Sequence, residues 1–156
     1  MKKILENLAK RLENTFENFM KFFIYTDGGS RGNPGNSAIG GVGFDEDGEE
    51  VFRYSKFLGI HTNNFAEYSS LIFALEKCLE FKADEVFATS DSELMVRQIN
   101  GIYKVRDKNI KVLFEKVLSL AKKFKSFKIV HKRRSEEKMP LADALVNEAM
   151  DKVMNN

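Results

Sequence analysis

The stretch YTDGGSRGNPG (residues 25–35) carries one carboxylate, Asp27, followed by four glycines within eight residues. The run KFFIYTD (21–27) is short, mainly apolar and rich in residues that favour strands, and we expect this strand to stop at the glycines. Asp27 would then lie at the carboxyl end of a strand, where ligands of α/β sheets tend to bind. No Gly-Lys-Ser/Thr follows the glycines, so a P-loop for nucleotide phosphates is excluded.

The segments that follow predict four further strands. SAIGGVGFDEDG and EEVFRYSKFL flank the turn 45–48 and predict an antiparallel hairpin, while DEVFATSD (84–91) and FKIVH (127–131) each predict one strand. Helical spacing of apolar residues predicts helices over 61–81, 92–100, 107–124 and 140–154. This order predicts an α/β fold (α+β mixed sheet), with a five-stranded mixed sheet of three antiparallel and then parallel strands, flanked by helices.

The amino-terminal residues predict an amphipathic helix outside the main body. Residues 2–20 place apolar side chains three and four positions apart, at Leu5, Leu8, Leu12, Phe16 and Phe19. We therefore divide the chain into a helical extension, residues 1–20, and a body, residues 21–156. Packing of the apolar stripe on the body is the default expectation, and self-association or contact with another protein is the alternative. We expect a monomer.

Length and composition indicate one globular domain with a single core. The chain has 156 residues, of which 43% are apolar and 31% charged. The one cysteine, Cys78, cannot form an internal disulfide and falls in an apolar stripe, which favours a buried thiol and a reducing cytoplasm. No apolar run is long enough to span a membrane, and the amino terminus lacks a secretory signal pattern. We therefore expect a cytoplasmic protein without membrane attachment.

Charge is distributed unevenly along the chain. The formal net charge is +2, yet residues 22–100 sum to −7 and residues 101–156 sum to +7. The acidic part suits metal or proton chemistry, and the basic part suits a polyanion. Lysine-rich amphipathic helices that are merely well solvated give the same pattern, and charge alone favours this second interpretation.

Four carboxylates fall where a mixed sheet would bring them together. Asp27 and Asp91 each end a predicted strand, whereas Glu67 and Asp143 lie in about the first turn of a predicted helix. An acidic residue in a first turn also has a simpler explanation, because it suits the helix dipole. As a cluster the four would repel one another, and hard divalent cations such as Mg²⁺ would relieve that repulsion. Two such ions suit in-line attack on a phosphodiester.

Four motifs in this order resemble type 1 ribonuclease H (ribonuclease HI), the family of enzymes that cut the RNA strand of RNA–DNA hybrids. The motifs are YTDGGSRGNPG (25–35), TNNFAEY (62–68), SDSELMVRQING (90–101) and ADALVNEA (142–149). The resemblance covers about residues 21–154. It implies a ribonuclease H-like fold in which residues 21–156 form the catalytic domain.

The resemblance implies a Mg²⁺-dependent endonuclease with a two-metal-ion mechanism. Asp27 would bridge two Mg²⁺ ions, with Glu67 and Asp91 on one ion and Asp143 on the other, and Mn²⁺ is an alternative ion. One ion would activate a water molecule and the other would stabilise the leaving 3′ oxygen, which gives 5′-phosphate and 3′-hydroxyl ends. No covalent protein intermediate is involved.

The same motifs imply contacts with the hybrid. Gly28, Gly29 and Ser30 would let the backbone approach the RNA strand and its 2′-hydroxyl groups. Asn63 matches a contact in the minor groove. Other positions matched to substrate are Asn33, Thr62, Asn64 and, where many relatives carry glutamine, Glu93. Helix capping at Thr62 or Asn63 and a turn at Asn33 are alternative roles for these residues.

Basic residues of the second half gain a phosphate-binding role beside such a site. The basic residues that we assign to contacts with the substrate are Lys104, Arg106, Arg133 and Arg134. The basic helical handle that some relatives carry after the Asp91 helix is not expected here, because few residues separate Gly101 from the next helix. The family often has a mobile histidine ahead of the last carboxylate. Either His131 serves, or Arg133 or Arg134 takes the electrostatic part; a structural role for His131 at a strand end is the alternative.

Two other functions stay open on sequence grounds. One is a non-catalytic module that binds RNA–DNA hybrids, and the other is a related carboxylate nuclease that acts on DNA. Retention of all four carboxylates argues against the binding module, because negative charge concentrated near phosphates weakens binding.

Overall fold

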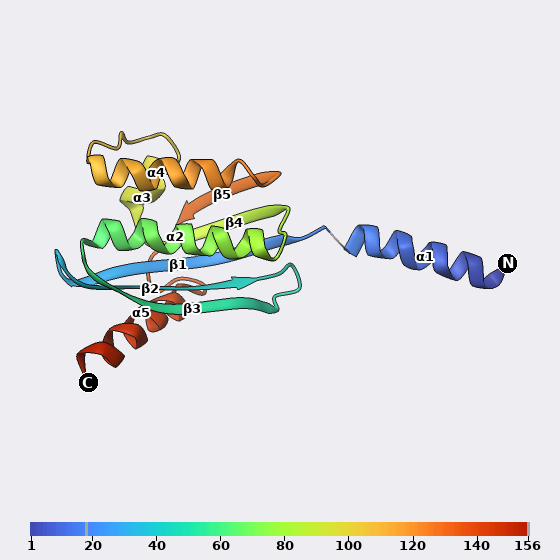
Figure 1. Ribbon diagram of the computed structural model, residues 1–156, viewed down its shortest axis with the longest axis horizontal. Helices are drawn as coiled ribbons and strands as arrows, with labels where there is room; N and C mark the ends of the chain where they lie inside the picture. Colours follow the sequence, from blue (N-terminus) through green and yellow to red (C-terminus); the bar gives the residue numbers. More distant parts are fainter. Residues whose placement is uncertain (18, 156) are drawn as a thin grey trace.

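The computed structural model describes residues 1–17 and 19–155, without the side chains of residues 10–17. Residue 18 of the predicted extension, and the side chains of Leu12 and Phe16 in its stripe, lie outside this description. Among the described helices, none is long and apolar enough to cross a membrane. In chain order (Figure 1) the elements are α1 (Lys2–Glu17), β1 (Lys21–Gly32), β2 (Gly35–Phe44), β3 (Glu50–His61), α2 (Asn63–Glu80), β4 (Glu85–Ser90), α3 (Glu93–Ile99), α4 (Lys108–Ala121), β5 (Ser126–His131) and α5 (Met139–Met154).

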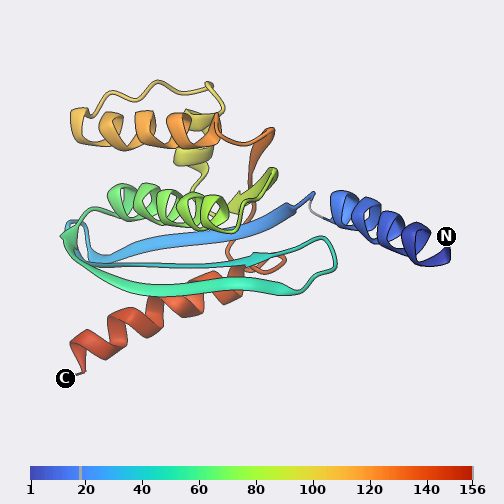
Figure 2. The ribbon, with the colours of Figure 1, turned by 45° about the vertical axis from the view of Figure 1, so that its right-hand side comes forward.

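One mixed sheet organises the body. Its strand order is β3-β2-β1-β4-β5; β2 pairs antiparallel with β1 and β3, and β4 pairs parallel with β1 and β5. Figure 1 and Figure 2 place α2, α3 and α4 on one face of the sheet and α5 on the other. The predicted sheet, its strand directions and the order of the elements are therefore confirmed.

The larger core lies between the sheet and the helices α2 and α4. It contains the fully buried side chains of Ile24, Tyr68, Leu71 and Leu75. Cys78 is buried in the same core, as predicted, and burial raises the pKa of its thiol to about 12. A smaller cluster packs α5 against β2 and consists of Ala38, Val146, Ala149 and Met150. Helices on both faces thus fix the sheet from two sides.

β1 continues through the glycines, where the sequence led us to expect its end. Its pairing with β2 extends from Phe23 to Gly32, and the chain reverses only at residues 33–34. Glycine does not end this strand because β2 continues to pair with it. The pairing with β4 stops earlier, at Thr26 opposite Ser90. Asp27 therefore lies in the middle of β1, not at its carboxyl end, but it is the first residue beyond the part that pairs with β4.

β1 and α2 approach so closely at Gly28 that no side chain fits between them. A Cβ atom added at Gly28 would overlap the backbone carbonyl of Ala66. At Gly29 the nearest atoms to an added Cβ lie 4.0 Å away, on Asn63 and Val146. Packing against α2 thus requires the first glycine, whereas the second glycine leaves open space on the opposite side of the strand.

The two helices that carry predicted site residues begin close to the predicted positions. Thr62 caps α2, and its hydroxyl accepts a hydrogen bond from the Phe65 amide at 3.1 Å. Glu67 is the fifth residue of α2 and Asp143 is the fifth residue of α5, so each lies just beyond the first turn of its helix. Interaction with the helix dipole weakens beyond the first turn, so the dipole alone does not explain these two acidic residues.

α1 extends away from the body in both views (Figure 1 and Figure 2). Of its described apolar side chains, Ile4 and Leu5 are 61% and 59% exposed, so the packing on the body that we expected by default is not observed. The chain is held in line with β1 at Met20. The Met20 amide donates to the Asp84 carboxylate at 2.9 Å, and its carbonyl accepts from the amides of Asp84 and Glu85.

Gly28→Ala is expected to lower the free energy of unfolding by about 1–3 kcal/mol, because the added methyl group must displace the backbone of α2. Gly29→Ala is the matched control, with an expected change of less than about 0.5 kcal/mol, since 4.0 Å of space is available there. Urea denaturation followed by circular dichroism measures both. Equal losses for the two variants would contradict the close approach at Gly28.

Candidate active site

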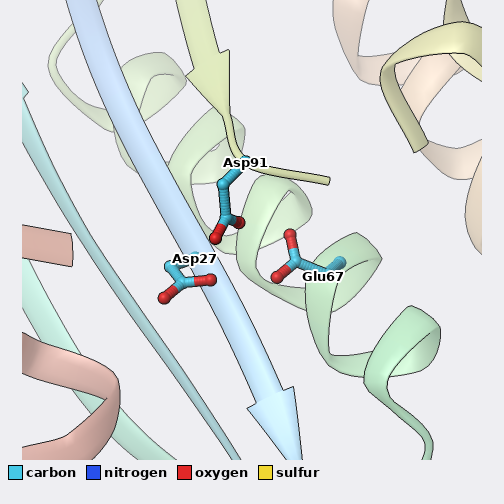
Figure 3. A group of neighbouring side chains, drawn as sticks. All are labelled: Asp27, Glu67 and Asp91. Atoms are coloured by element: carbon cyan, nitrogen blue, oxygen red, sulfur yellow. The ribbon is translucent and has the colours of Figure 1, made fainter. Parts of the chain in front are cut away.

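Three carboxylates from different parts of the fold meet beside β1 (Figure 3). Asp27 of β1, Glu67 of α2 and Asp91, which directly follows β4, each offer one oxygen, and these oxygens lie within 4.8 Å of one another. Asp27 and Glu67 are only 2% and 7% exposed, and Asp91 is partly buried. The structure therefore brings together three of the four acidic residues singled out in the sequence.

The strand register explains this convergence. β1 and β4 are parallel and stop pairing at Thr26 and Ser90, so Asp27 and Asp91 are the next residues on neighbouring chains. Beyond that point the Gly28 amide donates to Oε1 of Glu67 at 3.0 Å. The Ser90 hydroxyl donates to Oε2 of Glu67 at 3.3 Å. Glu67 thus binds both strands at the place where they separate.

Burial and mutual repulsion disfavour three negative charges in this position. Burial, and then the charge of Asp91, raises the pKa of Asp27 to about 7. Burial, and then the charges of Asp27 and Asp91, raises the pKa of Glu67 well above its ordinary value. The donated hydrogen bond from Gly28 opposes this rise in Glu67 without cancelling it. Near neutral pH the cluster therefore favours bound protons or a nearby positive charge.

Arg134 provides one such positive charge. Its Nε atom lies 3.2 Å from Oδ2 of Asp91 and 3.5 Å from Oδ1 of Asp143. The Arg134 side chain is 65% exposed, so solvent screens both ion pairs and each is weak. Asp143, on α5, is linked to the carboxylate cluster through this guanidinium. The side-chain amide of Asn147 lies 3.5 Å from Oδ2 of Asp143. The fourth predicted carboxylate thus borders the other three without belonging to their close cluster.

These residues line a cleft of about 430 Å³. Nine of its residues were predicted as site residues: Asp27, Gly28, Gly29, Ser30, Asn63, Glu67, Asp91, Arg134 and Asp143. Five were not predicted: Arg31, Ser92, Val146, Asn147 and Met150. Asn147 could have been found, because it lies four residues after Asp143 on the same face of a helix.

Polar residues at the mouth of the cleft are bonded to one another. Oδ1 of Asn63 accepts from the amide of Ser30 at 2.7 Å and from its hydroxyl at 3.1 Å. The backbone amide of Asn63 donates to Oδ1 of Asn33 at 3.0 Å. The backbone amides of Gly28 and Ser30 thus both donate hydrogen bonds within the protein. The open approach to the backbone lies at Gly29.

The remaining predicted residues lie outside the lining of this cleft. Thr62 caps α2, and Glu93 forms an ion pair with Arg97 at 2.9 Å. Within the described part of the chain, the buried Oδ1 of Asn64 has no hydrogen-bond partner. Four further predicted residues do not line the cleft and are exposed: Lys104, Arg106, His131 and Arg133.

Of the three candidates for the position ahead of Asp143, Arg134 is the one that contacts the carboxylates. His131 is the last residue of β5 and pairs in register with Ser90, so the strand fixes its position. Arg134 follows in the loop that leads to α5, and that loop lets its guanidinium reach Asp91 and Asp143.

Comparison with known sequences identifies relatives of this chain. A family model described as reverse transcriptase-like matches residues 25–149. The chain is 38% identical over 127 residues to the ribonuclease HI of Halobacterium salinarum. The matched stretch covers 81% of this chain and 63% of that protein. It is also 38% identical over 133 residues to a bifunctional protein of Mycobacterium tuberculosis, covering 85% of this chain and 36% of that protein. The chain thus spans less than two thirds of the length of these relatives.

Solved structures share the fold. The crystal structure of RNase H1 from Halobacterium salinarum superposes with a TM-score of 0.81 at 36% identity, over 85% of this chain and 98% of that one. An RNase H1 isolated from compost, in complex with an RNA/DNA hybrid, gives a TM-score of 0.79 at 44% identity, over 85% and 99% of the two chains. The predicted ribonuclease H-like fold is therefore confirmed.

Without divalent cations, Asp27→Asn is expected to stabilise the protein by about 1–3 kcal/mol at pH 8, and by less than half of that at about pH 5. The pKa of Asp27 is raised from 3.8 to about 7, so the folded state holds its proton more tightly than the unfolded chain does. That contribution to stability is complete below about pH 3.8 and is lost progressively as the pH rises from there through about 7.

Thermal unfolding of both proteins in a chelator, across this pH range, measures the effect. Glu115→Gln, an exposed change on α4, is the control and should shift the melting temperature little at either pH. A stabilisation by Asp27→Asn that is independent of pH would show that the Asp27 pKa is not raised.

Proposed function

The chain belongs to the ribonuclease H family, and from this premise we propose that it is a Mg²⁺-dependent endonuclease that hydrolyses the RNA strand of RNA–DNA hybrids. The products would carry 5′-phosphate and 3′-hydroxyl ends. The observation that carries this proposal is the cluster of Asp27, Glu67 and Asp91, with oxygens within 4.8 Å of one another in an open cleft. A relative of the same fold has been crystallised with an RNA/DNA hybrid.

The donor set fits hard divalent cations. It consists of carboxylate oxygens alone, two of the groups are buried, and their charges repel one another, which is the environment that Mg²⁺ or Mn²⁺ relieves. We assign Asp27, Glu67 and Asp91 to one ion, and Asp27 with Asp143 to a second. When bound, such ions would activate a water molecule and stabilise the leaving oxygen of a phosphodiester.

The residues of the chain itself position the reactants. Gly28 and Ser90 orient the Glu67 carboxylate through their hydrogen bonds, and the register of β1 and β4 fixes Asp27 beside Asp91. Arg134 pairs with Asp91 and Asp143 and would be displaced from these oxygens by a bound cation. Pre-formed carboxylates of this kind lower the reorganisation needed when charge develops on the phosphate.

The substrate would lie along the open side of β1. Gly29 leaves room for a sugar to approach the backbone, and Ser30, Asn33 and Asn63 form the bonded polar rim beside it. Contacts to 2′-hydroxyl groups at this rim would distinguish RNA from DNA. We place phosphate contacts on exposed basic residues of the second half, which are Lys104, Arg106, Arg133 and Arg134.

The division of the chain also enters this proposal. We assign catalysis to residues 21–156 and treat residues 1–20 as an extension, of which no described residue lines the cleft. A cytoplasmic location suits the lone, buried Cys78, which needs no oxidising compartment.

Asp91→Asn is expected to lower the rate of hybrid cleavage by at least about 1,000-fold, because it removes a charged oxygen from the cluster. The assay uses end-labelled RNA–DNA hybrid, duplex DNA and duplex RNA, each with Mg²⁺ or a chelator. Glu115→Gln is the control and should cleave like the unaltered protein. Intact hybrid with folded protein and Mg²⁺ would contradict the proposal, and cleavage of duplex DNA instead would assign the chain to the DNA-specific nucleases of this fold.

Arg134→Gln is expected to tighten Mg²⁺ binding by about 3–10-fold, because the guanidinium occupies oxygens that a cation would bind and each exposed ion pair contributes little. Titration calorimetry without nucleic acid measures the dissociation constant. Arg133→Gln removes the same charge from the neighbouring exposed position and is the control. Weaker Mg²⁺ binding in Arg134→Gln alone would show that Arg134 supports the ion site rather than competing with the ion.

A further inference from the structure

The loop between β5 and α5, residues 132–138, is bound to the sheet at both of its ends. At its start, the backbone amide of Lys132 donates to the carbonyl of Ser90, the last residue of β4, at 3.0 Å. At its end, the carboxylate of Glu137 accepts a hydrogen bond from the Tyr25 hydroxyl of β1 at 3.2 Å. Two neighbouring strands therefore fix where this loop begins and ends.

Glu137 makes a second contact within the loop. Its Oε1 atom lies 3.9 Å from Nζ of Lys132, so its carboxylate also joins the end of the loop to the start. Its backbone has a φ of 51°, a left-handed conformation that residues other than glycine adopt infrequently. The contacts of the side chain compensate for this unfavourable backbone conformation. Glu137 is therefore an anchor of the loop and not only a link to α5.

Arg134 lies in a tight turn between these two anchors. The backbone amide of Glu136 donates to the Arg133 carbonyl at 2.9 Å, and the Glu136 carboxylate accepts from the Arg133 amide at 3.2 Å. The turn leaves Nε of Arg134 at 3.2 Å from Asp91 and 3.5 Å from Asp143. Because the turn is closed on itself, a shift of either end of the loop would move the guanidinium.

The ion pairs of Arg134 are too weak to hold the loop by themselves. The side chain is 65% exposed, so solvent screens both pairs, and ordering a long side chain costs conformational entropy. The sheet offers a firmer support. The half-buried Tyr25 ring packs edge-on against Phe44 with 6.1 Å between ring centroids, and Nζ of Lys138 lies 4.2 Å from the Phe44 centroid. The end of the loop thus rests on fixed aromatic rings.

We propose that Tyr25 and Glu137 are positioning residues that hold Arg134 across Asp91 and Asp143, and that they thereby limit the access of a divalent cation to these two carboxylates. Neither Tyr25 nor Glu137 lines the cleft, so both act through Arg134. The positioning follows from the contacts of the loop alone, whereas its effect on a cation rests on the proposed function. The experiments below test the two parts separately.

The rate at which phenylglyoxal modifies Arg134 in a chelator, followed by peptide mass spectrometry, tests the positioning. Tyr25→Phe and Glu137→Ala should each raise this rate by about 2–10-fold, because each removes the same hydrogen bond and frees the guanidinium. Glu137→Gln keeps an acceptor for the Tyr25 hydroxyl and should react like the unaltered chain. Arg106, exposed and outside the loop, is the internal reference. An unchanged rate at Arg134 in both Tyr25→Phe and Glu137→Ala would overturn the positioning.

Titration calorimetry with Mg²⁺ tests the effect on the cation. Tyr25→Phe and Glu137→Ala should tighten Mg²⁺ binding by about 2–5-fold, and neither should tighten it further in Arg134→Gln. Loss of the Glu137 charge by itself would weaken binding, so the direction of the change separates release of Arg134 from a general charge effect.

Unchanged or weaker Mg²⁺ binding in both variants, or the same tightening in Arg134→Gln, would overturn the effect on the cation. A chain that binds no Mg²⁺ in any form would instead contradict the proposed function, and the modification rate of Arg134 would still decide the positioning.

Discussion

The close approach of α2 to β1 at Gly28 is the contact on which the carboxylate cleft depends. Because Gly28 lacks a side chain, the α2 backbone reaches the strand, and the Gly28 amide can donate to Glu67 at 3.0 Å. That bond replaces the strand partner that β1 loses where β4 ends. The same contact packs α2 against the sheet in the larger core and fixes the Glu67 carboxylate beside β1. Core packing and site geometry are therefore set together.

The cleft is electrostatically unfavourable in the protein alone. Two carboxyl groups are buried with raised pKa values, and the guanidinium that faces Asp91 and Asp143 is mostly exposed and only partly compensates. Each buried charge without a compensating partner destabilises the fold. A cluster of buried carboxyl groups therefore indicates a functional site rather than a packing feature. A cation bound to this cluster would stabilise the folded state.

The sequence predicted much of the fold, because strand and helix periodicity are local properties of the chain. It predicted the cluster of Asp27, Glu67 and Asp91 because two of them end predicted strands and all three lie in motifs that resemble one family. It did not predict how far β1 extends, since its glycines look like a turn until β2 is known to pair with them. It also left Arg134 undistinguished from His131, because the path of the loop before α5 decides which side chain reaches Asp143. The reason for Gly28 was likewise hidden, since it depends on the distance to a helix distant in sequence.

β1 has two different neighbours along its length, and this sets how easily its parts open. From Phe23 to Thr26 it pairs with strands on both sides, whereas from Asp27 to Gly32 only β2 continues as a strand partner. Local opening costs less free energy where fewer backbone bonds must break. We expect amide hydrogen exchange in the first half to require global unfolding, while the second half exchanges through smaller fluctuations. The end of the strand that lines the cleft can therefore adjust to a ligand while the core half stays closed.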